Sequence, residues 1–158
     1  MIRLAQIKDL DNLLAVYAAA RAFMRQNGNP TQWSGGYPSA GVLLADISAG
    51  QLYVVEQDGA IGGCFLLADG PDPTYAVIDG GWKSDAPYGV IHRVAGNGTI
   101  RGLFHQCAQF ARQRYRHLRI DTHADNHPMQ HVLQKEGFTF QGIIHLADGS
   151  PRLAYEWL

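Results

Sequence analysis

The chain has 158 residues, of which 46% are hydrophobic and 17% are charged, and its formal net charge is -1. This length suits one domain over residues 1–158. The composition excludes a disordered chain, and the small net charge argues against a general electrostatic attraction to nucleic acid. No apolar run approaches the roughly 20 residues that cross a bilayer, and the first residues lack a signal-peptide pattern. We therefore expect a cytoplasmic protein with neither a nucleic-acid nor a membrane partner.

Apolar residues in the first half of the chain recur with both helical and strand periods. These patterns predict a strand at residues 2–5, helices at 10–25 and 40–47, and strands at 51–56 and 61–67. Asp9 and Ser39 precede the two helices and are expected to be their N-caps. Asp58 and Gly59 form a strong hairpin signal, so the two strands that flank them should be antiparallel neighbours.

The second half begins with a long polar connection. Residues 68–87 carry prolines and glycines together with Trp82, and a connection of this length is usually functional or mobile. Beyond it we expect a strand at 88–95, a glycine-rich loop, a helix to about residue 116, and strands at 118–122, 138–146 and 152–158. This order of elements predicts a mixed sheet with helices on both faces.

The most informative stretch is the segment from Asn126 to Phe138, which joins a helix start, an apolar stripe and a glycine stop to a following strand. Pro128 suits the first turn of a helix, and Gly137 supplies the left-handed residue that ends it. The strand expected at 118–122 runs straight into this corner. An ordinary helix cap closed by glycine is the alternative interpretation of the stretch.

This corner resembles the C-terminal signature of the GNAT superfamily of acetyl-CoA-dependent N-acetyltransferases, in which an Asn precedes the helix and Gly-Phe follows it. The resemblance extends over nearly the whole chain. It implies a GNAT-like α/β (α+β) fold, whose mixed, mostly antiparallel sheet is splayed between its fourth and fifth strands, here 88–95 and 118–122. It also implies acetyl transfer to a primary amine by direct attack in a ternary complex, without a metal or an acyl-enzyme.

The resemblance places acetyl-CoA, as a co-substrate, at the glycine loop and at Asn126. Backbone N–H groups at a helix start suit a pyrophosphate, and Arg101 can add a charge-assisted contact. The loop departs from the family's pattern, because Thr99 stands at its basic position and Phe104 at its small one. A turn that serves only chain reversal is the alternative. The implied cofactor-binding residues are Val94, Ala95, Gly98, Thr99, Ile100, Arg101, Gly102 and Asn126.

Acetyl transfer needs a free amine, whereas an alkylammonium with a pKa of about 10 is protonated at neutral pH. His92 lies in the strand that the resemblance places beside the thioester, so we expect it to be the catalytic base, directly or through water. A histidine packed in the core is the alternative. Leu133 stands where relatives use a Tyr general acid, so Tyr155, water or unassisted departure of the thiolate must serve.

Trp33 and Tyr37 lie between the first two helices, where the superfamily builds its acceptor pocket. Aromatic walls suit an ammonium through cation–π attraction, and Trp82 can contribute from the long connection. The alternative is that these aromatics fasten a loop to the core. The sequence does not identify the amine, which is a small molecule or a peptide, and a homodimer stays open.

Three alternative interpretations are a metal site, a non-catalytic binding domain and a nucleotide-binding protein. His123, His127 and His131 recur every fourth residue, but Pro128 argues against one continuous helix, so no metal site is expected. A non-catalytic acyl-CoA-binding or sensor domain would keep Asn126 and the glycine loop but lack a base. A Rossmann-type protein would need its glycine turn after the first strand, which is not found here.

Overall fold

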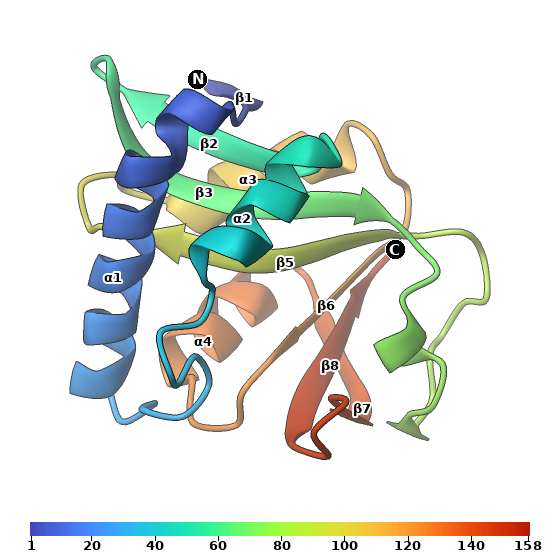
Figure 1. Ribbon diagram of the computed structural model, residues 1–158. Helices are drawn as coiled ribbons and strands as arrows, with labels where there is room; N and C mark the ends of the chain where they lie inside the picture. The colour runs from blue at the N-terminus through green and yellow to red at the C-terminus, as the bar shows by residue number, and fades with distance from the viewer.

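The computed structural model describes residues 1–158, which form one eight-stranded sheet with helices on both faces (Figure 1). The strands are β1 (Ile2–Leu4), β2 (Leu52–Gln57), β3 (Ala60–Asp69), β4 (Asp79–Gly80), β5 (Gly89–Gly96), β6 (Leu118–Thr122), β7 (Thr139–His145) and β8 (Pro151–Trp157). The helices are α1 (Leu10–Gln26), α2 (Ala40–Ser48), α3 (Leu103–Arg112) and α4 (His127–Lys135), with short 3-10 turns η1 (Ile7–Asp9) and η2 (Pro73–Tyr75). The strands are arranged in the order β1-β2-β3-β5-β6-β8-β7-β4, which confirms the predicted fold.

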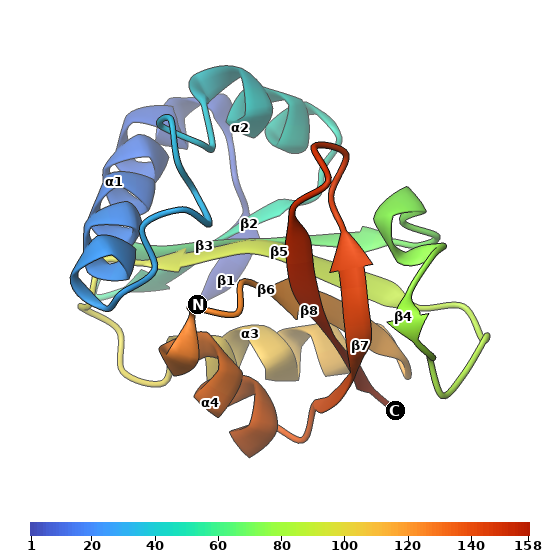
Figure 2. The same cartoon turned by 90° about the horizontal axis from the view of Figure 1, so that it is seen from below.

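The two faces of the sheet carry separate cores. Figure 2 shows α1 and α2 on one face and α3 and α4 on the other. Leu13 and Tyr17 of α1 pack with Leu43 of α2 in the first core, and Phe104 of α3 packs with Leu133 of α4 in the second. Since strand side chains alternate between faces, the strands next to the gap can give apolar groups to one core and polar groups to the opposite face.

The sheet opens between β5 and β6, as predicted. These strands are parallel and pair only at Gly89 with Leu118 and at Val90 with Arg119. Further along β5, Arg93 and Val94 together lie opposite one residue of β3, and Arg93 has a positive φ of 50°. A bulge of this kind bends its strand. It therefore turns the rest of β5 away from β6, and the gap is visible in Figure 1.

Two local expectations were wrong, and a third is narrowed to one of its two alternatives. Asp9 does not cap α1 with its side chain, because its carboxylate accepts from the guanidinium of Arg3 and the N–H of Gln6. Helix α3 ends at Arg112, before residue 116, because the chain turns to place the Tyr115 ring against Gly89 of β5. The 68–87 connection is ordered by η2 and by β4, which pairs with β7.

The predicted N-cap of α2 is present. The Ser39 hydroxyl caps α2 by accepting from the N–H of Val42 at 3.3 Å. Cys64 and Cys107 are buried free thiols on opposite faces of the sheet. None of the helices has both the length and the apolar character that crossing a membrane requires.

Candidate active site

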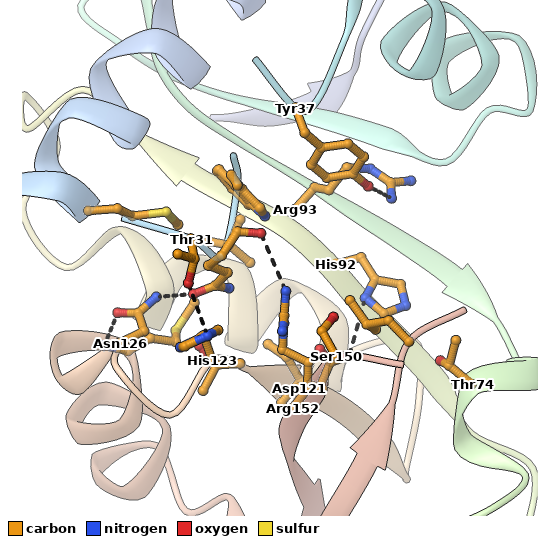
Figure 3. A pocket seen from close by; sticks show the side chains of 18 of the residues that line it. Thr31, Tyr37, Thr74, His92, Arg93, Asp121, His123, Asn126, Ser150 and Arg152 are labelled. Carbon is orange, nitrogen blue, oxygen red and sulfur yellow. Dashed lines mark hydrogen bonds and ion pairs between the residues drawn. The ribbon is translucent and has the colours of Figure 1, made fainter. Parts of the chain in front are cut away.

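The gap between β5 and β6 forms a cavity of about 670 Å³. Its walls come from the α1–α2 loop, the middle of β5, the end of β6 with the start of α4, and the β7–β8 turn with the start of β8. Figure 3 shows side chains from these segments directed toward a common space. The cavity brings together five of the residues predicted to act in the site: Trp33, Tyr37, His92, Val94 and Asn126.

His92 lies on β5 between two carboxylates. Its Nε2 is 2.7 Å from Oδ2 of Asp72, and its Nδ1 is 3.8 Å from Oδ2 of Asp121 on β6. The side chain of His92 is 25% exposed and lines the cavity, so it is not a core histidine. When the Nε2 proton is donated to Asp72, Nδ1 is the nitrogen that can accept a proton.

Asp72 is fixed by its neighbours in the connection after β3. Its Oδ1 accepts from the N–H and the hydroxyl of Thr74 at 2.9 and 2.6 Å, while its Oδ2 faces His92. Partial burial opposes ionisation, but the hydrogen bonds from His92 and Thr74 outweigh it and hold the pKa of Asp72 well below its usual range. Asp72 is therefore an anion at neutral pH and can stabilise an imidazolium at His92.

Asp121 is also held in place by a buried partner. The Tyr75 hydroxyl donates to Oδ2 of Asp121 at 2.7 Å. Burial, with the adjacent carboxylate of Asp121, raises the pKa of Tyr75 well above its usual range, so this phenol stays protonated. The side of the cavity around His92 thus carries two fixed negative charges, which favour a cation.

Arg93 fastens the bulge of β5 to α2. Its guanidinium binds both carboxylate oxygens of Asp46 at 2.8 Å and donates to the hydroxyl of Tyr37 at 3.0 Å. The Tyr17 hydroxyl donates to the Arg93 carbonyl at 2.7 Å. These contacts hold the bulge in one conformation and fix Tyr37 at the edge of the cavity.

Asn126 is buried and caps α4, as Figure 3 shows at the left of the cavity. Its Oδ1 accepts from the N–H of Met129 at 3.2 Å, and its Nδ2 donates to Oε1 of Gln32 at 3.0 Å. The side chain thereby ties the α1–α2 loop to α4. An amide has two donor hydrogens and two acceptor lone pairs, so Asn126 keeps one of each for a ligand.

The glycine loop lies outside the lining of this cavity, at the start of α3. Gly98 and Gly102 have φ values of 84° and 66°, a conformation that favours glycine. The backbone N–H groups of Gly98, Ile100, Arg101 and Gly102 donate to no protein acceptor. Arg101 is exposed and forms no ion pair. Free amides beside a free guanidinium fit a pyrophosphate.

Three other residues predicted at the cofactor site contribute little through their side chains. Ala95 packs in the α1 core, and Ile100 packs in the α3 core. The Thr99 hydroxyl donates to Oδ1 of Asn97 at 2.6 Å and so stabilises the loop itself. At these positions the backbone is the group available to a ligand.

The three aromatics predicted at the acceptor pocket divide into two groups. Trp33 and Tyr37 line the cavity, and Trp33 also packs on Tyr17 with 5.5 Å between ring centroids. Trp82 does not line it: its indole covers the Arg119 guanidinium at 4.0 Å and donates to the carbonyl of Tyr75. Trp82 thus fastens the long connection to the sheet.

The residues named in connection with the missing general acid lie in the core. Leu133 is fully buried between α4 and the sheet, and Tyr155 is 2% exposed in the same core, on the face away from His92. Tyr155 therefore does not reach the cavity. Nor does the chain contain a cluster of three metal-ligating side chains: His123 contacts Thr31, and His131 is exposed.

Asp72, Thr74, Asp121 and Arg152 are among the residues of this site that the sequence did not single out. Asp121 and Arg152 each carry a charge inside an expected strand, next to Ile120 and Leu153 respectively, which was a usable signal for a polar site on that face. Asp72 and Thr74 lie in a proline-flanked turn, where such residues commonly serve only the turn. No sequence pattern linked them to His92.

These features agree with the comparisons. The family model described as the acetyltransferase (GNAT) family matches residues 15–138. The splayed sheet, the cavity beside it and the glycine loop define the acetyltransferase class, and the chain belongs to the GNAT family. The family generally uses acetyl-CoA or another acyl-CoA. No curated protein is significantly similar to the chain.

Among solved structures, a GNAT-family acetyltransferase from Streptococcus agalactiae is 33% identical with a TM-score of 0.87, the match covering 100% of this chain and 94% of that one. A ribosomal-protein-alanine N-acetyltransferase from Brucella melitensis is 19% identical with a TM-score of 0.64, covering 100% and 99%. A GNAT-like decarboxylase in complex with isobutyryl-CoA is 16% identical with a TM-score of 0.65, covering 99% and 98%. The last two show the fold alone.

Proposed function

We propose that the protein transfers the acetyl group of acetyl-CoA to a primary amine, by direct attack of the amine within a ternary complex. The single observation that carries the proposal is the Asp72–His92 pair in the wall of the cavity, 2.7 Å apart, with Nδ1 of His92 free of that bond. It supplies a proton acceptor at the place where the family carries out its transfer chemistry.

Each residue has a definite role in this proposal. Asp121 and the ring of Tyr37 attract the ammonium, and His92 accepts the proton that the nitrogen loses. As the nitrogen bonds to the acetyl carbon, the carbon–sulfur bond breaks. Backbone donors at the Val94 bulge support the oxygen on which charge develops. Departure of the thiolate needs no acid, because a thiol has a pKa of about 8.5.

The co-substrate would be held at three places. The N–H groups of Gly98, Ile100 and Gly102, with Arg101, are suited to the pyrophosphate, and Asn126 is suited to the amide-bearing arm. The β5 edge beyond Val90 has no strand partner on the β6 side, which leaves its backbone groups for that arm. The bound molecule supplies an activated acetyl group.

Non-catalytic acyl-CoA binding is a second candidate. It is favoured by Leu133 at the place of the usual Tyr, since that side chain is fully buried and offers no acid. The two candidates differ in turnover: an enzyme releases CoA when an amine is added, whereas a sensor binds acetyl-CoA without consuming it.

Calorimetric titration with acetyl-CoA, followed by an amine panel in a free-thiol assay, tests the proposal. The panel should contain amino acids, polyamines, aminoglycoside-like amines and peptide N-termini. We expect acetyl-CoA binding and amine-dependent thiol release for one class, with the acetylated product seen by mass spectrometry. Binding without thiol release from any amine would favour the sensor, and no binding at millimolar acetyl-CoA would refute both.

A further inference from the structure

Arg152 is a buried cation that faces the cavity without an anionic partner. It lies on β8, its exposure is 7%, and Figure 3 shows its guanidinium rising into the cavity. Nη1 donates to the carbonyl of Pro151 at 2.8 Å, and Nη2 donates weakly to the carbonyl of Gln32 at 3.4 Å. Asp148 also lines the cavity and its carboxylate feels the charge of Arg152, but it is exposed and its Oδ1 accepts from Ser150. No ion pair forms between them, and three of the five N–H donors of Arg152 have no protein acceptor.

The other buried arginine of the chain, Arg119, has a carboxylate and two aromatic rings as partners. Arg119 is 5% exposed, lies 3.8 Å from Oε2 of Glu156, and is sandwiched by the rings of Trp82 and Tyr88 at 4.0 Å each. A buried charge is expected to be paired in this way, because an unpaired one is costly to keep out of water. Arg152 keeps its charge in the cavity wall without such a partner, as expected of a group that binds an anion.

The position of Arg152 relates it to the His92 end of the cavity. Asp121 of β6 pairs with Ala154 of β8, and Arg152 is two residues from Ala154, so Arg152 and Asp121 share one face of the sheet. Both line the same cavity as His92 and Asp72. The wall around His92 therefore carries two carboxylates, and the neighbouring wall carries the buried guanidinium of Arg152, with the exposed carboxylate of Asp148 nearby.

This pattern is complementary to a molecule with an ammonium and a carboxylate. We propose that Arg152 binds a carboxylate of the acceptor, so that the acceptor is an amino acid or a similar amine with a carboxylate. This inference rests on the proposed function and names the substrate class of that site. A guanidinium matches a carboxylate with two parallel hydrogen bonds, and Arg152 has three donors available.

The anionic groups of the co-substrate do not account for Arg152. The free amides suited to a pyrophosphate belong to residues 98–102, which do not line this cavity, whereas Arg152 does. The contact with Gln32 suggests a purely structural role, in which Arg152 supports the α1–α2 loop. If Arg152 had only a structural role, its replacement would affect every acceptor alike, whereas a carboxylate-binding role would affect only acceptors that carry a carboxylate.

The test compares amino acids with their C-terminal amides, using kcat/KM for CoA release by the wild type, Arg152→Gln and Arg152→Lys. In the wild type we expect the amino acids to be preferred. In Arg152→Gln the ratio of acid to amide should fall about 10- to 100-fold, because the acids lose a charge-assisted contact while the amides lose only a neutral one, so that kcat/KM for the amides falls much less. Arg152→Lys should keep part of the preference. Arg116→Gln, at an exposed residue without a hydrogen-bond partner, is the control.

The results distinguish failure of this inference from failure of the proposed function. An equal fall for acids and amides in Arg152→Gln, or no change in the ratio, would overturn the inference and leave the proposed function intact. Absence of turnover for every amine would instead refute the proposed function. If Arg152→Gln fails to fold, product inhibition of the wild type tests the inference instead. N-acetyl amino acids should inhibit, in competition with the acceptor, at least tenfold better than their C-terminal amides. Equal inhibition would overturn the inference.

Discussion

Asp72→Asn changes one atom of the side chain that orients His92, and we expect it to lower kcat by about 10- to 100-fold. The charge-assisted hydrogen bond between them is 2.7 Å long, and such a bond is worth about 1.5–3 kcal/mol. Each 1.36 kcal/mol corresponds to about a factor of ten in rate. Solvent reduces the effect, because the side chains of His92 and Asp72 are 25% and 18% exposed.

The reason for the expected loss is a change of tautomer. An Asn amide donates to Nε2 of His92, which moves the imidazole proton to Nδ1 and blocks the nitrogen that should act as the base. The bonds from Thr74 can persist, since Asn keeps Oδ1. The fold and the acetyl-CoA affinity should therefore change little.

The assay is steady-state CoA release with the best acceptor of the amine panel, measured between pH 6 and about 9. The rate should fall across this range, because the variant lacks the negative charge that stabilises the imidazolium formed when His92 accepts the proton. Asp85→Asn, at an exposed residue of the same connection, is the matched control. An Asp72→Asn variant with wild-type kcat across this range would refute this reasoning.

Because the pKa of Asp72 is lower in the folded state, its contribution to stability is present above about pH 4 and is lost as the pH falls. In Asp72→Asn the free energy of unfolding should therefore depend less steeply on pH in the acidic range, as followed by circular dichroism. An identical dependence would contradict this prediction. Trp82→Ala should cost about 2–3 kcal/mol of stability, measured as a lower Tm, with an unchanged KM for the acceptor; a raised KM with normal stability would instead put Trp82 in the acceptor site. Asn126→Ala should lose about 1 kcal/mol of stability through the lost helix cap and should also weaken acetyl-CoA binding about 5- to 100-fold. Asn126→Ser should keep the cap and show only the weaker binding. An acetyl-CoA affinity equal to wild type in both variants would mean that Asn126 acts only as a helix cap. Cys107→Ser should keep turnover, because burial raises the pKa of that thiol well above its usual range; complete inactivation of a folded variant would point to a covalent route.

The sequence was sufficient for the order of elements and for the place where the sheet opens. Helix α4 and its glycine stop follow from local periodicity and turn chemistry, which depend on neighbouring residues only. The early end of α3 was not predictable in the same way. It depends on Tyr115 packing against Gly89, a contact between residues far apart in sequence.

The candidate site was predicted only in outline for the same reason. His92 was identifiable from its strand, but its partner Asp72 comes from a turn 20 residues away whose course depends on tertiary contacts. Trp33 and Trp82 are both aromatics in loops. Only the three-dimensional arrangement distinguishes a cavity wall from a side chain that covers Arg119.

The most direct test of the account is the single-turnover rate of acetyl transfer in His92→Gln, with acetyl-CoA and the best acceptor both saturating at neutral pH. If His92 accepts the amine proton, the rate should fall by about 10²–10⁴-fold, while the dissociation constant for acetyl-CoA stays within about twofold of the wild type. A His92→Gln variant that retains the full rate would contradict the central claim and would favour a route in which water or the substrate itself removes the proton.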